Sequence, residues 1–336
     1  MKYILGIDTS NYKTSIAVVD REKHIICDLR RFLTVKQGER GLRQSDALFQ
    51  HLQNLPELME EMRREFDGSI DAVACSDRPR PVEGSYMPVF LAGSGFAKAV
   101  AVALQVPLVS FSHQEGHMEA IRAYSTLQDM PCFLACHFSG GTCEVLDVSE
   151  TDPAEKTAYR IEIIGGTKDI SFGQVLDRTG VALGMEFPAG QQLDQMAENF
   201  SLADPDRLAE ATEACRLTPV KVKDGWLNLS GLDTQARTRI DRLGLTDGDD
   251  LLSCALAAEL FKKISKAASD MIIQCAKQSG QDHVLLAGGV ASSHYLRRSM
   301  TEQLQSKGIT AVFGDGYLSQ DNAVGTALLG GKSIWA

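Results

Sequence analysis

The chain has 336 residues, of which 44% are hydrophobic and 23% are charged, and its formal net charge is −10 at pH 7. These values are typical of a globular protein large enough for two domains, each with its own core. The net charge argues against a broad nucleic-acid-binding face but is compatible with a local basic patch. No apolar run approaches the roughly 18 residues that span a bilayer, and no signal-peptide pattern precedes the first strand. We therefore expect a cytoplasmic protein that does not associate with membranes.

Eight cysteines are scattered along the sequence, several of them inside apolar segments. This distribution is typical of buried free thiols in a reducing compartment and not of a disulfide framework. Cys132 and Cys136 alternate with apolar residues in a predicted strand, which disfavours a metal-binding role for this pair.

The hydrophobic pattern predicts two α/β halves, each opening with a strand, a polar turn and a return strand. The first half has the expected order strands 2–7, 14–19 and 24–29, helix 45–66, strand 70–75, helix 88–104 and strand 106–111. The second half has the expected order strands 133–138, 144–148 and 159–164, helices 172–183 and 191–200, a strand running into a turn at 226–232, helix 249–278, strand 283–286, a helix from 293, strand 309–313 and helix 323–329. We expect Ser45 or Asp46 to cap the helix 45–66, and Pro56 to kink or divide it.

The two polar turns are 8–13 and 139–142, and both contain residues able to present hydroxyls and backbone amides to a phosphate. Taken alone, the first turn is more simply a plain hairpin with Asp and Asn as turn formers. Two such halves facing across a cleft describe the two-lobed actin-like ATPase fold, with duplicated mixed sheets flanked by helices. We predict a first lobe at 1–112, to which a C-terminal helix at 319–336 returns, and a second lobe at 113–318 with a helical insertion around 190–225.

His113 and His117 follow the strand 106–111 at the start of a segment with helical character. On a helix, a spacing of four residues places the two imidazoles about 40° apart, so that they form half of a metal site. Glu115 would lie roughly 200° from His113, facing away, so the pair does not match the HExxH protease motif. By itself the pair is equally consistent with two histidines at the surface or at the edge of a core.

Two features near the C-terminus point to the same cleft. Gly288 and Gly289 end the strand 283–286, where a base or ribose is able to rest. Asp321 precedes the last helix, where an Asp is most often only a helix cap. In the actin-like fold, however, this helix returns to the cleft, and Asp321 would then supply a carboxylate to the two histidines.

Seven segments spread over nearly the whole chain resemble the TsaD or glycoprotease-like family of the actin-like ATPase superfamily, whose members make threonylcarbamoyladenosine in tRNA. They are GIDTS (6–10), PLVSFSHQEGH (107–117), FSGGT (138–142), LDRTGVALGMEFPAG (176–190), LSGLDT (229–234), LLAGGVASSHYLR (285–297) and QDN (320–322). Each motif alone is weak, but their order and spacing agree with the family.

The resemblance implies an iron or zinc ion held by His113, His117 and Asp321. It also implies an adenine nucleotide (ATP, AMP or threonylcarbamoyl-AMP), bound by a second set of residues. These are His137, Phe138, Ser139, Gly140 and Gly141 at the phosphate, Asp177, Gly190 and Asp194 around the ribose and base, the pair Gly288 and Gly289, and Ser293 at the adenine. No catalytic side chain is assigned.

The implied activity is an acyl transfer and not proteolysis. Threonylcarbamoyl moves from threonylcarbamoyl-AMP to the adenosine next to the anticodon, AMP leaves, and no covalent enzyme intermediate is needed. The metal ion would serve as Lewis acid and template. The implied partners are the adenylate, tRNA and a second actin-like protein.

The sequence departs from the family pattern in four places. Asn11, Tyr12 and Lys13 replace Cys-Asp-Glu in the first turn, the His before Thr142 is missing, Ser293 replaces Asn, and Arg78-Pro79-Arg80-Pro81 replaces Pro-Gly-Pro-Gly. These departures keep two alternatives open. One is a diverged paralogue that transfers a carbamoyl or acyl group to another acceptor, and the other is a non-catalytic nucleotide-binding partner.

Overall fold

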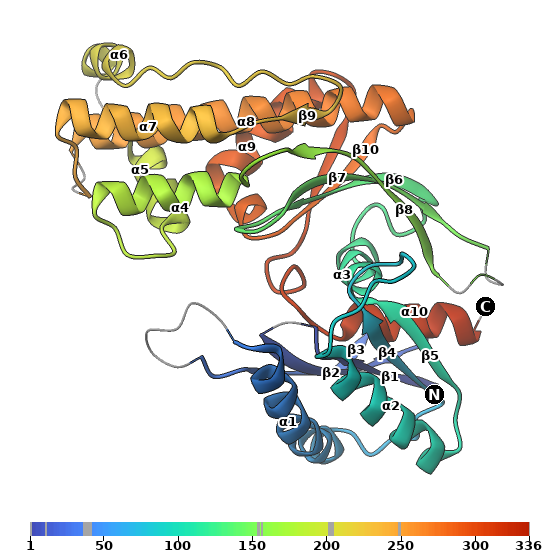
Figure 1. Cartoon of the computed structure of the whole chain (residues 1–336). Helices are drawn as coiled ribbons and strands as arrows, with labels where there is room; N and C mark the ends of the chain where they lie inside the picture. Colours follow the sequence, from blue (N-terminus) through green and yellow to red (C-terminus); the bar gives the residue numbers. More distant parts are fainter. Residues whose placement is uncertain are drawn as a thin grey trace. The chain divides into compact units, whose positions relative to one another are not determined.

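The computed structural model describes residues 2–10, 12–35, 42–152, 155, 157–200, 205–247 and 250–335. Asn11 and Asp249 lie outside the described residues. The chain forms two compact units, the first built from Met1–Pro131, Ser149–Ile161 and Gly314–Ala336, and the second from Cys132–Val148 and Glu162–Phe313 (Figure 1). The segment 113–131, which the sequence predicts to belong to the second lobe, groups with the first unit.

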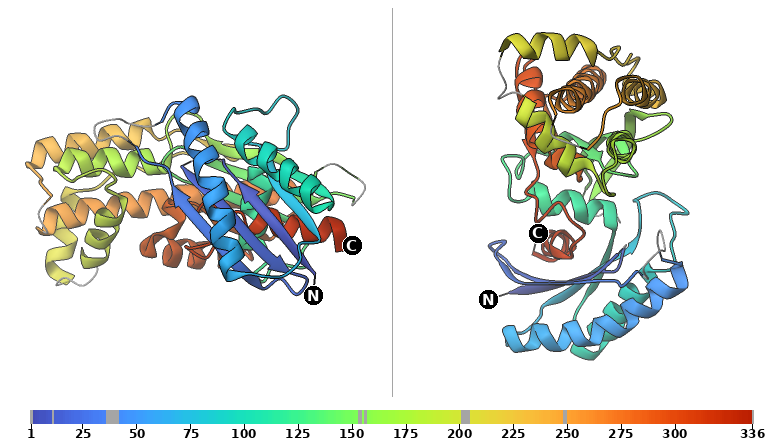
Figure 2. Two further views of the ribbon diagram at one scale, coloured as in Figure 1. Left: turned by 90° about the horizontal axis from the view of Figure 1, so that it is seen from below. Right: turned by 90° about the vertical axis from the view of Figure 1, so that its left-hand side faces the viewer.

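A five-stranded mixed sheet in the order β3-β2-β1-β4-β5 forms the centre of the first unit. Its strands are β1 (Tyr3–Asp8), β2 (Lys13–Asp20), β3 (Ile25–Phe32), β4 (Ala72–Arg78) and β5 (Leu108–Ser112). Strand β1 pairs antiparallel with β2 and parallel with β4. Helices α1 (Gln44–Glu65) and α2 (Phe90–Leu104) cover one face, and α10 (Val324–Trp335), which packs on α3 (His113–Arg122), covers the other (Figures 1 and 2). Because both faces are covered, β2 is buried along its whole length.

Glycines bring α10 close to both of its neighbours. A Cβ at Gly6 of β1 would lie 2.4 Å from the carbonyl oxygen of Ala323, and a Cβ at Gly325 of α10 would lie 1.8 Å from that of Gly116 of α3. No side chain fits at either position, so the backbones of α3 and α10 cross in direct contact. This crossing sets the distance between the residues at the start of α3 and those just before α10.

A six-stranded sheet in the order β11-β10-β6-β7-β8-β9 forms the centre of the second unit. Its strands are β6 (Cys132–Phe138), β7 (Cys143–Glu150), β8 (Tyr159–Thr167), β9 (Trp226–Leu227), β10 (His283–Ala287) and β11 (Thr310–Phe313). The helices of this unit are α4 (Phe172–Leu183), α5 (Gly190–Phe200), α6 (Pro205–Ala214), α7 (Ser230–Leu243), α8 (Leu251–Ser279), α9 (His294–Gln305) and the short 3₁₀ helix η1 (Val290–Ser292). Helix α8 is buried along most of its length and carries much of the core of the unit.

Two predictions about helices were wrong. Helix α1 starts after Arg43 without a side-chain cap, so neither Ser45 nor Asp46 caps it. Pro56 does not divide the helix, which continues from Gln44 to Glu65. The predicted strand at 226–232 is present as β9 (Trp226–Leu227), but the turn expected after it is replaced by the start of α7 at Ser230.

The start of α7 depends on a residue that is distant in sequence. The carboxylate of Asp169 accepts hydrogen bonds from the backbone N–H groups of Leu229 (2.8 Å) and Ser230 (2.9 Å). This carboxylate satisfies two of the N–H groups that a helix start leaves unpaired. A local pattern around 226–232 contains no equivalent cap.

All eight cysteines are free, and all except the half-buried Cys132 are buried, as predicted. Burial raises the pKa of the Cys75 thiol to about 12, so it stays protonated near neutral pH. Among the described residues, no helix is long and apolar enough to cross a membrane.

Candidate functional site

Helix α3 begins directly after β5 because its first turn caps itself. The Ser112 hydroxyl accepts a hydrogen bond from the Glu115 N–H (3.2 Å), and the Glu115 carboxylate accepts one from the Ser112 N–H (2.7 Å). The second carboxylate oxygen of Glu115 accepts from the Ala158 N–H (2.7 Å), and the side chain is fully buried. Glu115 therefore stabilises the helix start, which agrees with its predicted exclusion as a protease base.

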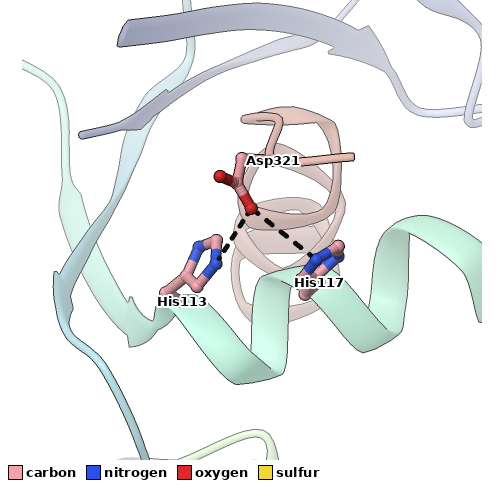
Figure 3. A group of neighbouring side chains, drawn as sticks. All are labelled: His113, His117 and Asp321. Atoms are coloured by element: carbon pink, nitrogen blue, oxygen red, sulfur yellow. Dashed lines mark ion pairs between the residues drawn. The ribbon is translucent and has the colours of Figure 1, made fainter. Parts of the chain in front are cut away.

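Three side chains of the first unit converge on one point. His113 and His117 lie on the first two turns of α3, with ring centroids 5.2 Å apart. Asp321 Oδ1 lies 3.5 Å from His113 Nε2 and 3.8 Å from His117 Nε2 (Figure 3). One ligand atom from each residue lies within 4.8 Å of the others, and no second group of this kind occurs in the described part of the chain. Two imidazoles and one carboxylate at this spacing suit a single divalent ion with open coordination positions.

Asp321 is available to the histidines because its neighbour caps the last helix. Asn322 Oδ1 accepts hydrogen bonds from the N–H groups of Val324 (2.9 Å) and Gly325 (3.4 Å). Its amide nitrogen donates to the carbonyls of Leu318 (2.9 Å) and Gln320 (2.7 Å). The helix-cap role considered for Asp321 thus belongs to Asn322, and the Asp321 carboxylate points at the imidazoles instead.

Asp8, at the end of β1, holds His113 from its other side. Asp8 Oδ2 lies 3.0 Å from His113 Nδ1, and Oδ1 accepts from the Ser10 N–H (3.1 Å) and hydroxyl (2.5 Å). Such a carboxylate fixes the ring so that Nε2 faces the site. Burial alone would lower the pKa of His113, but Asp8 and Asp321 together raise it to about 10. Burial opposes ionisation of Asp8 as well, yet the charge and hydrogen bond of His113 leave the Asp8 pKa below its usual range.

Lys13 brings a positive charge to this site. The residue is 6% exposed, and its ammonium donates to Gln320 Oε1 (2.6 Å) and lies 4.6 Å from the centre of the Phe32 ring. Burial lowers the pKa of Lys13, while the charge of Asp321 partly counteracts this. Lys13 therefore places a positive charge near Asp321, the carboxylate of the candidate metal site. The resemblance implies an acidic residue at position 13. Tyr12, beside it, is 41% exposed.

The second unit contains a pocket of about 700 Å³, a size common for small-molecule sites. Six residues predicted to bind the nucleotide line it: Gly140, Asp177, Gly190, Asp194, Gly289 and Ser293. Phe187, which is 74% exposed, also lines the pocket and was not among the predicted site residues. One indication of this role was present in the sequence, since Phe187 lies in the segment 176–190 that resembles the family.

The other five predicted residues do not line this pocket. Phe138 is buried and packs edge-on against Phe172. The Ser139 hydroxyl accepts from the Gly141 N–H (3.3 Å) and so shapes the turn. Gly288 leaves no room for a side chain, because a Cβ there would lie 2.3 Å from the Phe138 carbonyl oxygen. His137 is half-buried at the end of β6.

Three pocket residues also stabilise the surrounding backbone. Asp194 accepts from the Ser293 hydroxyl (2.6 Å) and from the His294 N–H (2.9 Å) at the start of α9. The same Ser293 hydroxyl accepts from the Leu296 N–H (3.1 Å), so it is the N-cap of α9. Asp177 accepts from the Ala189 N–H (3.0 Å), which fixes the segment before α5. A nucleotide that hydrogen-bonds Asp194 or Ser293 would share them with this helix cap.

The two mixed α/β units and the cluster of two histidines and one aspartate define a protein of the actin-like ATPase fold with a candidate metal site. Solved structures of this fold resemble the chain at low sequence identity. HypF from T. kodakarensis has a TM-score of 0.59 at 13% identity, with 98% of this chain and 47% of HypF covered. A transcriptional regulator of the ROK family has a TM-score of 0.53 at 12% identity, with 99% and 78% covered. At these identities, the likeness concerns the fold alone.

The family model "TsaD: tRNA N6-adenosine threonylcarbamoyltransferase" matches residues 34–328. A protein named tRNA N6-adenosine threonylcarbamoyltransferase from Thermus thermophilus is 28% identical over 331 residues, covering 97% of this chain and 91% of that relative. Its namesake from Neorickettsia sennetsu is 26% identical over 324 residues, covering 95% and 90%. The chain belongs to the TsaD family of transferases, as its motifs predicted.

Proposed function

We propose that this chain transfers threonylcarbamoyl from threonylcarbamoyl-AMP to the adenosine next to the anticodon of tRNA. The observation that carries the proposal is the convergence of His113, His117 and Asp321 in a member of the TsaD family. The family match along most of the chain favours this activity over a paralogue with another acceptor. A non-catalytic partner would have no use for such a cluster.

The chemistry of the donor set fits iron or zinc. Two imidazole nitrogens and one carboxylate are typical of catalytic zinc sites and of non-haem iron sites, both of which leave positions open for substrate. Asp8 supports His113 in the way that carboxylates support metal-bound histidines elsewhere. A bound ion would supply a Lewis acid and a template for the carbamoyl and phosphate oxygens of the adenylate.

The pocket of the second unit would hold the adenylate. Gly140 and Gly173 approach so closely that a Cβ on Gly173 would lie 2.7 Å from the Cα of Gly140. The turn at 139–142 therefore lies against the start of α4, and backbone N–H groups at a helix start favour a phosphate. Asp177 and Gly190, which line the same pocket, would face the ribose and base.

In the transfer itself, the acceptor amino group forms a bond to the carbamoyl carbon. The bond from that carbon to the adenylate phosphate oxygen breaks, AMP leaves with the electron pair, and the amino group gives up one proton to water. A second actin-like protein would assist, and the reaction would take place in the cytoplasm.

The test is a transfer assay with threonylcarbamoyl-AMP and tRNA that lacks the modification, with and without candidate partner proteins, read out by mass spectrometry of the nucleosides. We expect His113→Ala, His117→Ala and Asp321→Ala each to reduce product formation about 100-fold or more. His24→Ala is the control, since this exposed histidine of the first unit pairs with Asp20 outside the cluster. Product formation by His113→Ala at the wild-type rate would refute the metal-dependent mechanism, and transfer only to other acceptors would indicate the paralogue.

A further inference from the structure

A basic groove of about 400 Å³ lies in the second unit, apart from the residues that line the nucleotide pocket. Its lining consists of Lys168, Lys221, Lys223, Asp224, Trp226, Leu227 and Asn228. The three lysines are exposed, and none of them is ion-paired to a carboxylate in the part of the chain that the structure describes. Because the whole chain carries a net charge of −10, three unpaired lysines around one hollow form a distinct local field.

Backbone hydrogen bonds hold the groove in one shape. Lys223 and Trp226 donate to each other's carbonyl oxygens, both at 2.9 Å, and the Lys168 N–H donates to the Leu227 carbonyl, also at 2.9 Å. Gln274 of α8 binds the same hairpin, accepting from the Gly225 N–H (3.0 Å) and donating to the Val222 carbonyl (3.3 Å). The lysines thus project from a fixed frame, which reduces the entropy cost of binding a ligand.

Trp226 gives the groove a flat apolar wall. Its ring lies over Gly166, where an added Cβ would be 3.5 Å from the ring, and Lys168 Nζ lies 6.0 Å from the ring centroid. The residue is half-buried, so part of the indole is open to solvent. An ammonium group beside an open indole suits a ligand that carries both negative charge and a stacking surface. Asp224 is the one carboxylate in the lining, and it would repel a phosphate placed directly over it.

We propose that this groove is an RNA contact surface, in which Lys168, Lys221 and Lys223 bind backbone phosphates and Trp226 stacks on an unpaired base. The inference rests on the proposed function, which requires a tRNA acceptor. Single-stranded RNA segments are commonly bound in this way, by cations along the backbone and aromatic rings against the bases. An acidic peptide would satisfy the lysines but would leave the indole without a partner.

The experiment is the binding of the full-length protein to fluorescently labelled, unmodified tRNA, measured by anisotropy at several salt concentrations. The test variant carries Lys168→Gln, Lys221→Gln and Lys223→Gln. The matched control carries Lys262→Gln, Lys277→Gln and Lys307→Gln, three exposed lysines of the same unit that do not line the groove, so that both variants have the same net charge.

Each lost phosphate contact lowers the slope of log K against log salt by about 0.7–0.9, so we expect the groove variant to lose about two units of slope. Its affinity near 100 mM salt should fall more than tenfold, while the control keeps the wild-type slope. Trp226→Leu should weaken binding about tenfold without changing the slope, and Trp226→Phe should restore most of that loss.

Equal slopes and affinities for the groove variant and its control would overturn the inference and leave the proposed transfer unaffected. If polyglutamate displaced the tRNA as effectively as unlabelled tRNA at the same ionic strength, the groove would be a general polyanion site, which also overturns it. If the groove variant bound tRNA and formed product as the wild type does, the groove would be overturned and the proposed function kept.

Discussion

Replacing Asn322 by alanine tests whether the cap of α10 positions Asp321. The change removes the acceptor for the N–H groups of Val324 and Gly325 and the donor for the carbonyls of Leu318 and Gln320. Loss of an N-cap costs about 1–2 kcal/mol. The Leu318 carbonyl, buried and left without its partner, adds about 1 kcal/mol, while the carbonyl of the exposed Gln320 adds little. Asn322 is only 4% exposed, so water replaces little of this, and we expect Asn322→Ala to lower the free energy of unfolding by about 2–3 kcal/mol.

Asn322→Ala should also weaken metal binding, because Asp321 directly precedes Asn322 and its backbone would no longer be held in place by the cap. Outer residues that orient metal ligands typically contribute 10–100-fold to affinity. The assay has two parts: urea denaturation of the metal-free protein, and competition for zinc against a chromophoric chelator. We expect zinc affinity to fall at least tenfold. Asn322→Asp, which keeps the acceptor and loses both donated bonds, should give an intermediate stability.

Asp250→Ala is the matched control, since Asp250 caps α8 of the second unit through the N–H groups of Leu252 (2.9 Å) and Ser253 (3.0 Å). It should lower stability by about 1–2 kcal/mol and leave zinc affinity unchanged. If Asn322→Ala bound zinc within twofold of the wild type, Asp321 would not depend on the cap, and our account of its position would be wrong.

Three further predictions concern other parts of the chain. Gly93→Ala should lower the free energy of unfolding by about 1–3 kcal/mol, measured by urea denaturation, because its Cβ would lie 2.7 Å from Thr9 Oγ1; an unchanged midpoint would show that α2 shifts freely. Lys13→Met should raise zinc affinity, because it removes a positive charge near Asp321, and a decrease in the competition assay would contradict this. Asp169→Asn should destabilise the protein at pH 7, and the difference in stability from wild type should shrink as pH falls below about 4. Partial burial opposes ionisation, but the N–H groups at the start of α7 lower the pKa of Asp169. The carboxylate therefore stabilises the fold above its unfolded-state pKa, and this contribution disappears as the folded carboxylate protonates. A difference that stayed constant down to pH 3 would refute that explanation.

Elements with local start and stop signals could be predicted from the sequence. Helix α4 has the predicted bounds because Ser171 caps it locally, accepting from the Gln174 N–H, and Gly184 ends it at a φ of +103°. Helix α7 could not be predicted, since its capping carboxylate, Asp169, lies 60 residues before the N–H it binds. A short stretch of sequence shows the periodic pattern of a helix, but it does not show a hydrogen-bond partner that another element supplies.

In the candidate site too, local features could be predicted from the sequence and contacts between distant residues could not. The spacing of His113 and His117 on one helix predicts that they share a face, and the structure confirms their convergence. The hydrogen bond between His113 Nδ1 and the Asp8 carboxylate joins residues 105 positions apart, and no spacing rule indicates it. Asp321 and Asn322 are both suitable helix caps, so only the path of the backbone decides which of them faces the histidines.

X-ray absorption spectroscopy of the metal in the purified wild-type protein would identify the ligands of the bound ion. We predict about one iron or zinc ion per chain, with two imidazole nitrogens at about 2.0–2.1 Å, carboxylate oxygen at a similar distance and no sulfur neighbour. A shell of sulfur ligands near 2.3 Å, or a spectrum unchanged when His113 and His117 are both replaced by alanine, would place the metal elsewhere and contradict the account.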